Sequence, residues 1–280
     1  MIHRRWILGS VAAALLVTWT LRPLPAAPLF ASGGVSFLAP APDDAARSQD
    51  QKMAQLAKDA PIAFLTECLA RYDREVKGYR AVMQKQERIA GRLQPKEIIK
   101  VCFKEKPHSV LLVWIEGARR AERALYVDGE NNGKMLARPN GLIARKVAGD
   151  VVERDVDGSD ARQSGRYPLN EYGIKKGTER TLAAWRAAHD QGALHVEFLG
   201  EQLVKEAGDR PCYKLRRRYA RPENDGVTEL TLYVDKENLL QVGSVLKGTG
   251  GKLIGEYFFR DLELNPAFSD GQFERGALTP

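Results

Sequence analysis

The sequence lacks the motifs of several common enzyme classes. It has no G-x-S-x-G nucleophile motif, no H-E-x-x-H zinc motif and no G-x-G-x-x-G dinucleotide motif. The run Gly248–Lys252 contains glycines before a lysine, but Leu253 follows, so we predict a hairpin turn there rather than a phosphate loop. The four histidines have no spacing typical of a metal or acid–base site. We therefore expect no catalytic residues, no cofactor and no metal.

Cysteine is scarce as well. Cys68, Cys102 and Cys212 are far apart, and no C-x-x-C pair exists, which excludes zinc-ribbon and thioredoxin motifs. In an oxidising compartment Cys102 and Cys212, both in strand-like runs, are our preferred disulfide pair. The alternative is that all three are small buried residues.

The N-terminus predicts export. Arg4 and Arg5 precede the apolar run Trp6–Leu21, and small residues follow, as in a secretory signal peptide. We place cleavage near Ala26–Ala27, which makes residues 1–27 the signal peptide. The alternative is an uncleaved membrane anchor, because the run approaches the ~17-residue minimum for a spanning helix. Either way, we expect a periplasmic or cell-envelope protein.

Charge gives little support for nucleic acid as a partner. Taking the three leader arginines, with no accompanying acid, from the formal net charge of +7 leaves +4. A weak attraction to an anionic membrane surface is compatible with that charge. The densest basic cluster, Lys214–Arg221, is either a contact for a lipid head group or anionic partner, or an exposed strand face paired with acids.

Residues 28–50 are rich in Ala, Pro, Gly and Ser and end in a polar stretch, so we predict a flexible linker. We assign residues 51–280 to one domain. Apolar residues at helical spacing predict a helix over Gln51–Val76, interrupted at Pro61. Pro61 is expected in the first turn of the second helical piece.

Strand-like segments dominate the rest of the chain. The segment Val110–Ile115 is apolar on both faces and predicts a central, covered strand. Thr178–His189 is expected to be a helix capped by Thr178. The other predicted strands are Tyr79–Ile89, Glu97–Phe103, Ala124–Asp128, Lys134–Arg138, Leu142–Val147, Val151–Asp155, Leu194–Val204, Cys212–Tyr219, Thr228–Asp235, Leu239–Lys247 and Lys252–Glu263.

This order predicts an α+β fold. We expect one large, strongly curved antiparallel sheet, an unclosed β-barrel, with helices covering its concave face. The C-terminal strands are expected to continue the sheet that begins at Tyr79, with the Thr178–His189 helix between the two halves.

Large apolar side chains from both halves and from the helical insert could line a cavity between the sheet and its helices. The alternative is that the aromatics, which include Phe258, form an ordinary core. The predicted cavity residues are Trp114, Tyr126, Leu182, Trp185, Phe198, Tyr257 and Phe259.

The ending of the chain carries a family resemblance. The sequence Leu232-Tyr-Val-Asp235, Gly251-Lys252, Tyr257, Asp261-Leu-Glu263 and Phe273 resembles the LolA/LolB-like lipoprotein-carrier superfamily. Within it, Arg166-Tyr-Pro-Leu169 with Gly173, and Leu125-Tyr-Val-Asp-Gly129, resemble the bacterial family called domain of unknown function 1571. The resemblance implies an unclosed barrel whose helices cover a hydrophobic cavity for acyl chains. The charged segment Val147–Arg166 has no counterpart in these carriers.

Two functions follow as hypotheses. The first is an exported envelope protein that binds an acyl chain or a lipidated partner protein, without catalysis. The second is an envelope sensory or scaffolding module that binds another protein through the exposed face of the sheet.

Overall fold

The computed structural model describes residues 44–223 and 225–279. The chain divides into residues 1–41 and Pro42–Pro280, and every described residue belongs to the second unit. The predicted signal peptide and residues 28–43 of the predicted linker lie outside the described residues. Within the described part of the chain, no helix is both long enough and apolar enough to cross a bilayer.

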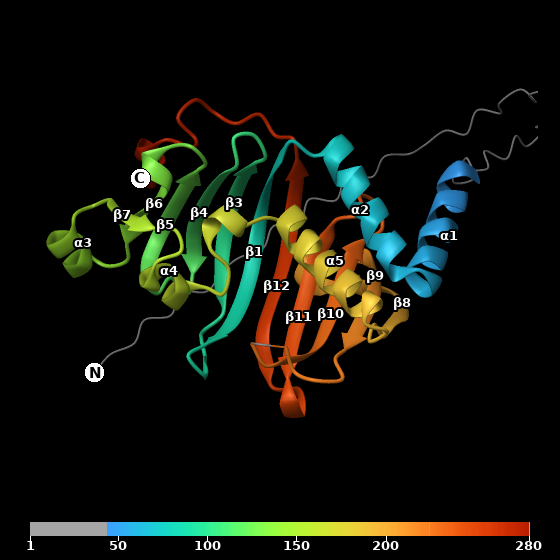
Figure 1. The fold of residues 1–280 in the computed structure, drawn as a ribbon. Coiled ribbons are helices and arrows are strands. Elements are labelled where there is room, and N and C mark those ends of the chain that lie inside the picture. Colours follow the sequence, from blue (N-terminus) through green and yellow to red (C-terminus); the bar gives the residue numbers. More distant parts are fainter. Residues whose placement is uncertain (1–43, 224, 280) are drawn as a thin grey trace, which may run out of the picture. The chain divides into compact units, whose positions relative to one another are not determined.

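Twelve strands form one antiparallel sheet (Figure 1). They are β1 (Gly78–Ile89), β2 (Arg92–Leu93), β3 (Glu97–Lys104), β4 (Ser109–Glu116), β5 (Ala121–Val127), β6 (Lys134–Pro139), β7 (Val152–Asp155), β8 (Val196–Val204), β9 (Arg210–Arg218), β10 (Val227–Asp235), β11 (Gln241–Gly248) and β12 (Leu253–Leu264). The order is β7-β6-β5-β4-β3-β1-β12-β11-β10-β9-β8, with β2 paired to β1. Since β7 and β8 stand at opposite edges of the described sheet, the barrel is unclosed.

The pairing of β1 with β12 joins the two halves of the sheet. Met83 on β1 lies opposite Phe259 on β12 and opposite Ile99 on β3. The three C-terminal strands form the predicted meander, and Thr249–Gly251 makes the turn between β11 and β12. One continuous sheet is therefore confirmed.

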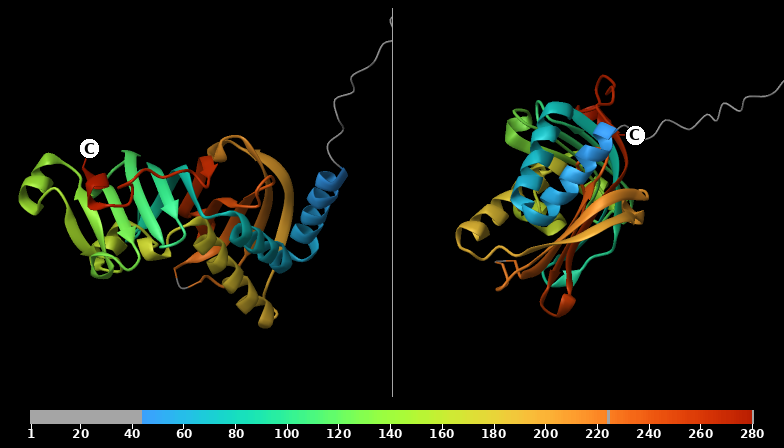
Figure 2. Two further views of the ribbon diagram at one scale, coloured as in Figure 1. Left: turned by 90° about the horizontal axis from the view of Figure 1, so that it is seen from above. Right: turned by 90° about the vertical axis from the view of Figure 1, so that its right-hand side faces the viewer.

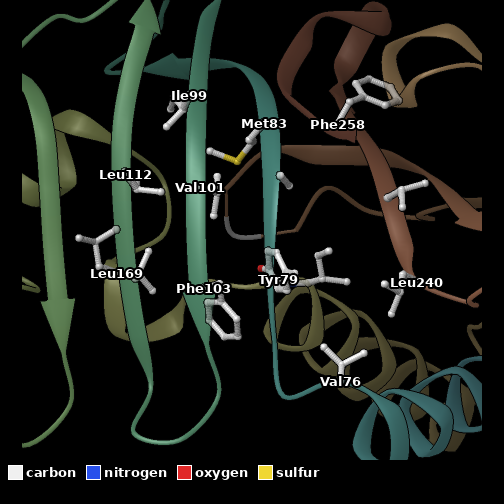
Figure 3. Packing of buried hydrophobic residues seen from close by; sticks show 14 of the residues in the cluster. Val76, Tyr79, Met83, Ile99, Val101, Phe103, Leu112, Leu169, Leu240 and Phe258 are labelled. Carbon is white, nitrogen blue, oxygen red and sulfur yellow. The ribbon is translucent and has the colours of Figure 1, made fainter. Parts of the chain in front are cut away.

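Strand β4 is buried on both faces over Ser109–Leu112, as its sequence predicts, whereas Ile115 near its end is 49% exposed. Leu111 packs against Leu278 near the C-terminus, on the face away from the helices. Leu112 belongs to the core beneath the helices, together with Met83 and Leu169 (Figure 3). Alternating side chains of one strand thus contribute to two separate cores.

The described residues form five α-helices. They are α1 (Asp44–Asp59), α2 (Pro61–Glu75), α3 (Leu142–Ala148), α4 (Ser159–Ser164) and α5 (Ile174–Asp190). Helices α2, α4 and α5 lie over the concave face of the sheet, as predicted, whereas α3 stands beyond its β7 edge (Figure 1). Pro61 occupies the first turn of α2, where its missing N–H has no helical partner to lose, so the predicted break is confirmed. Helix α1 begins at Asp44, so Asp44–Asp50 are helical rather than linker.

The strand predicted over Leu142–Val147 is wrong, because these residues form α3. Leu, Ala, Arg and Lys, which make up most of the segment, all favour helix. The edge of β6 that a further strand would need is occupied by β7. Gly141 and Gly149, at φ of 90° and 95°, begin and end the segment in conformations that favour glycine.

Helix α5 begins four residues before the predicted helix, so Thr178 is not its cap. The Thr178 hydroxyl donates to the carbonyl of Ile174 inside the helix. At the true N-terminus the Ile174 N–H donates to the hydroxyl of Tyr79 at 3.2 Å. A side chain from β1, distant in sequence, therefore satisfies one of the free N–H groups of the first turn.

Gly173 fixes the start of α5 and gives a stability prediction. Its φ is +125°, and a Cβ there would lie 3.1 Å from the ring of Phe103. We expect Gly173→Ala to lower the free energy of unfolding by about 1–3 kcal/mol. Gly177→Ala is the matched control within α5, where the nearest atom would be 3.8 Å away, and it should raise stability by up to ~1 kcal/mol. Urea denaturation measures both; equal effects of the same sign would contradict this account.

All three cysteines are free thiols. Cys102 lies on β3 and Cys212 on β9, and four strands separate them in the sheet. The predicted Cys102–Cys212 disulfide is therefore wrong. Cys68 and Cys212 are buried, which agrees with the alternative for these two.

Candidate functional site

A cavity of about 560 Å³ lies against the concave face of the sheet. Its floor comes from both halves of the sheet, and its roof from α3, α4, α5 and the segment Gly165–Gly173. Ligand pockets in proteins usually measure about 300–1,000 Å³. The cavity is therefore large enough for a sizeable organic ligand.

Six apolar residues line the cavity around α4, and the ion pair of Arg154 with Asp160 also belongs to the lining there. Ala124 of β5 and Ala137 of β6 leave space there, while the longer side chains form the walls. The residues are Leu112, Ala124, Met135, Ala137, Ala161 and Leu169. Ala124 and Ala137 are paired across β5 and β6, so two adjacent positions of the floor carry only a methyl group. These six side chains can pack against hydrocarbon and offer it no hydrogen bonds.

A buried group of charges interrupts this apolar surface. Lys85 and Glu87 of β1 line the cavity, and Glu97 of β3 is the cross-strand partner of Lys85. The Lys85 ammonium lies 3.3 Å from a carboxylate oxygen of Glu87 and 3.5 Å from one of Glu97. The two carboxylate side chains are 3% and 5% exposed. Buried charges of this kind persist only when paired and hydrogen-bonded.

Each of these carboxylates has further donors. The indole N–H of Trp114 donates to Glu97 at 2.6 Å, and Arg119 Nε donates to the other oxygen at 3.0 Å. The Tyr257 hydroxyl donates to Glu87 at 2.7 Å. With Lys85 and Arg119 balancing the two acids, the group is electrically neutral.

The pKa of Glu87 is lower than its ordinary value. Burial raises the pKa of this carboxyl, but the Lys85 ammonium and the hydrogen bond from Tyr257 lower it by more. The backbone N–H of Arg166 adds a further hydrogen bond at 3.2 Å. Glu87 is therefore ionised at neutral pH, inside an otherwise largely apolar wall.

The segment Gly165–Gly173 passes directly over this charged group. A Cβ on Gly165 would lie 3.5 Å from the Lys85 ammonium and 3.6 Å from Glu87. The side chain of Arg166 pairs with Asp225 in the turn between β9 and β10. The segment is thus tied both to the floor of the cavity and to a hairpin of the C-terminal half.

Aromatic contacts hold the same segment against α5. The Tyr167 and Tyr257 rings are 5.9 Å apart, and the Arg180 guanidinium lies 4.2 Å from the centre of the Tyr167 ring. All three residues line the cavity. Tyr167 therefore forms part of the boundary between the cavity and solvent.

The sequence of this chain matches the family described as "protein of unknown function (DUF1571)" over residues 76–277. The chain belongs to the DUF1571 family. The match includes every strand and the helices α3, α4 and α5 that roof the cavity. A comparison with curated proteins gives no match.

Several solved structures resemble this DUF1571 protein. MucB is 17% identical with a TM-score of 0.48, over 78% of this chain and 64% of MucB. The lipoprotein LppX of Mycobacterium tuberculosis is 10% identical with a TM-score of 0.43, over 76% and 100%. A LolA superfamily protein of Nitrosomonas europaea is 9% identical with a TM-score of 0.34, over 76% and 98%. This chain thus spans less than two thirds of MucB, and similarities this weak add no argument about function.

Three of the seven predicted cavity residues line the cavity of the DUF1571 protein. They are Trp114 on β4 and Tyr257 and Phe259 on β12. Trp114 and Tyr257 also donate hydrogen bonds to the buried carboxylates, a role that the sequence did not indicate. Their contact with a ligand stays a prediction.

The other four predicted residues lie outside the cavity lining. Tyr126 is buried beside His108, with the rings 6.0 Å apart. Leu182 and Trp185 of α5 are buried in the core beneath α1 and α2, and Phe198 of β8 packs against that core. Leu182, Trp185 and Phe198 therefore fill the space between the helices and the sheet at the C-terminal part of α5.

Lys85, Glu87 and Glu97 were missed. The signal was present on β1, where period-two alternation places Met83, Lys85 and Glu87 on one face. Charged residues at the end of such a row usually face solvent. The segment Gly165–Gly173, from the middle of the chain, covers Lys85 and Glu87, while Trp114 and Arg119 contact Glu97.

The other polar features resolve as structural contacts. His108 Nε2 donates to the carbonyl of Leu169 at 3.0 Å. In the cluster Lys214–Arg221, Arg216 pairs with Glu197 and Arg218 with Glu229, as the interpretation of an exposed, paired face expects. Within residues 44–223 and 225–279, no group of three or more His, Cys, Asp or Glu side chains is placed to hold a metal ion.

The low pKa of Glu87 predicts an acid-sensitive stability. Because the folded-state pKa lies below the ordinary 4.5, ionised Glu87 stabilises the fold above that pH. The contribution is lost as the pH falls through the folded-state pKa. We expect Glu87→Gln to be less stable than the parent near pH 7 and to approach it at pH values well below 4.5. Urea midpoints measured across this range test the prediction, and a pH-independent difference would contradict it.

Proposed function

We propose that this protein is an exported envelope protein that binds an acyl chain, either of a free lipid or of a lipidated protein, in the cavity beneath α4 and α5. It acts by sheltering the chain from water and not by catalysis. The observation that carries the proposal is the 560 Å³ cavity with its apolar portion. The apolar run Trp6–Leu21 after two arginines supports export, with residues 1–27 as the leader.

The charged group gives the cavity a polarity that suits an amphipathic ligand. Hydrocarbon is favoured beneath α4, where Leu112, Met135 and Leu169 line the space. Hydrocarbon is disfavoured next to Lys85 and Glu87. It would remove the water that still reaches these charges and would offer them no hydrogen bond in return. We infer that the chain end of the ligand lies beneath α4 and that its polar part lies toward Lys85 and Glu87.

A titration with a fluorescent polyene fatty acid tests the proposal. We expect saturable binding to one site and displacement by palmitate. Among saturated fatty acids, affinity should rise about fourfold for each added methylene until the chain fills the apolar part, because each buried methylene contributes ~0.8 kcal/mol. Absence of saturable binding, or affinities independent of chain length, would contradict the proposal.

A second candidate function has its own observation. Strand β8 is an edge of the described sheet and exposes Leu199 and Leu203. An exposed edge with apolar side chains can accept a strand from another protein. The chain would then be a sensory or scaffolding module. Cross-linking from β8 in the cell envelope, with a protein captured but no acyl chain in the cavity, would favour this function over the first.

A further inference from the structure

Helix α3 carries the most exposed large apolar side chains of the described residues. Ile143 and Val147 are 81% and 84% exposed, and Leu142 is 71% exposed. All three lie within one helix of seven residues. In Figures 1 and 2 this helix stands at the end of the sheet beyond β6 and β7, away from α1, α2 and α5.

The exposed residues form one face. At about 100° per residue, Leu142, Ile143 and Val147 fall on an arc of about 140°. Lys146 lies within that arc and is exposed. The helix contains two basic residues, Arg145 and Lys146, and no acidic one. The outer face is therefore apolar with a positive charge at its centre.

The opposite face fastens α3 to the body of the protein. The Arg145 guanidinium lies 2.9 Å from Glu122, which also pairs with Arg138 of β6. Ala144 and Ala148 line the cavity. The helix is thus part of the cavity roof, and its apolar outer face is held outward by ionic contacts beneath it.

This composition matches a lipid bilayer that contains anionic lipids. Helices that lie in the bilayer interface place aliphatic side chains among the acyl chains and basic side chains at the phosphates. A lysine among apolar residues suits that position, because its long stem lets the ammonium reach the head groups. A membrane also contacts all of a convex, projecting helix, and no groove in a partner is needed.

A second copy of the chain fits this face less well. Three aliphatic side chains offer on the order of 300 Å², whereas a stable interface buries ~800 Å² on each partner. A two-fold contact through this arc would also bring the two Lys146 ammonium groups near each other. Both the area and the charge disfavour self-association.

We propose that the outer face of α3, formed by Leu142, Ile143, Lys146 and Val147, docks the protein on the surface of an anionic membrane. Docking there places the cavity roof at the bilayer surface. The inference concerns the surface and does not depend on what occupies the cavity, so vesicle binding and fatty-acid binding can fail independently.

A reporter on the face itself tests the proposal in the full chain. In Val147→Trp, we expect the added tryptophan to be quenched by vesicles of brominated phosphatidylglycerol, relative to the parent chain. Leu203→Trp is the matched control, since Leu203 is 67% exposed on the distant strand β8. It should show no such quenching. No quenching at position 147, or equal quenching at both positions, would overturn the proposal.

Two further variants separate the apolar and ionic contributions. A triple replacement of Leu142, Ile143 and Val147 by serine should reduce partitioning into anionic vesicles at least about tenfold, because most of the inserted apolar area is lost. Lys146→Ala should reduce it about fivefold on phosphatidylglycerol and leave binding to phosphatidylcholine unchanged. If the triple variant binds vesicles as the parent does, the proposal is wrong. It is also wrong if the only effect of the replacement is to abolish a dimer that the parent forms without lipid.

Discussion

Replacing Glu97 with leucine is expected to lower the free energy of unfolding by about 3–5 kcal/mol, because it removes one partner from a buried ionic group. Glu97 accepts hydrogen bonds from Trp114 and Arg119 and lies 3.5 Å from the Lys85 ammonium. Leucine accepts none of these hydrogen bonds, so the Trp114 indole N–H loses its acceptor and Arg119 keeps only uncharged ones. Lys85 keeps Glu87 as its one carboxylate, which leaves the group with an excess positive charge. Urea denaturation of parent and variant measures the loss.

Two controls make this result specific. Glu263→Leu removes an exposed carboxylate, 3.4 Å from Arg80, and should change stability by less than about 1 kcal/mol. Adding Lys85→Met to Glu97→Leu should recover part of the loss, because one uncompensated charge is removed with it. If Glu97→Leu proves no worse than Glu263→Leu, the group does not stabilise the fold as described.

Filling the apolar part of the cavity is expected to weaken fatty-acid binding at least about tenfold. Ala137 lies on β6 and lines the cavity, so Ala137→Trp places an indole ring where hydrocarbon would lie. Excluding only two methylenes from apolar contact costs about 1.6 kcal/mol, which corresponds to roughly this factor. The displacement titration with palmitate measures the change.

The control for this variant is Ala193→Trp, which adds the same side chain at an exposed position after α5. It should bind palmitate as the parent does. If Ala137→Trp fails to fold, Ala161→Phe narrows the same space from α4. Unchanged affinity in a folded cavity variant would show that the acyl chain, if bound, lies elsewhere.

Much of the sheet could be predicted because it follows local rules. Period-two alternation, with turns that contain asparagine or glycine, identifies β10, β11 and β12, and unbroken apolar sequence identifies β4 as a covered strand, which holds for its first half. Pro61 marks the break between α1 and α2 by its missing N–H. Each of these signals lies within a dozen residues, so no tertiary information is needed.

The cavity and its charged group depend on tertiary contacts and could not be predicted in this way. Lys85 and Glu87 are buried by Gly165–Gly173, about 80 residues later in the chain. The start of α5 depends on the hydroxyl of Tyr79. Trp185 is a large aromatic residue of the kind that often lines a ligand pocket, yet the packing of α1 and α2 places it in the core.

Protein recovered from the cell envelope shows whether an acyl chain occupies the cavity. Organic extraction followed by mass spectrometry should yield one acyl-bearing lipid per chain from the parent and Ala193→Trp, and much less from Ala137→Trp. An extract free of acyl chains from correctly folded parent protein, or equal amounts from Ala137→Trp, would contradict the claim.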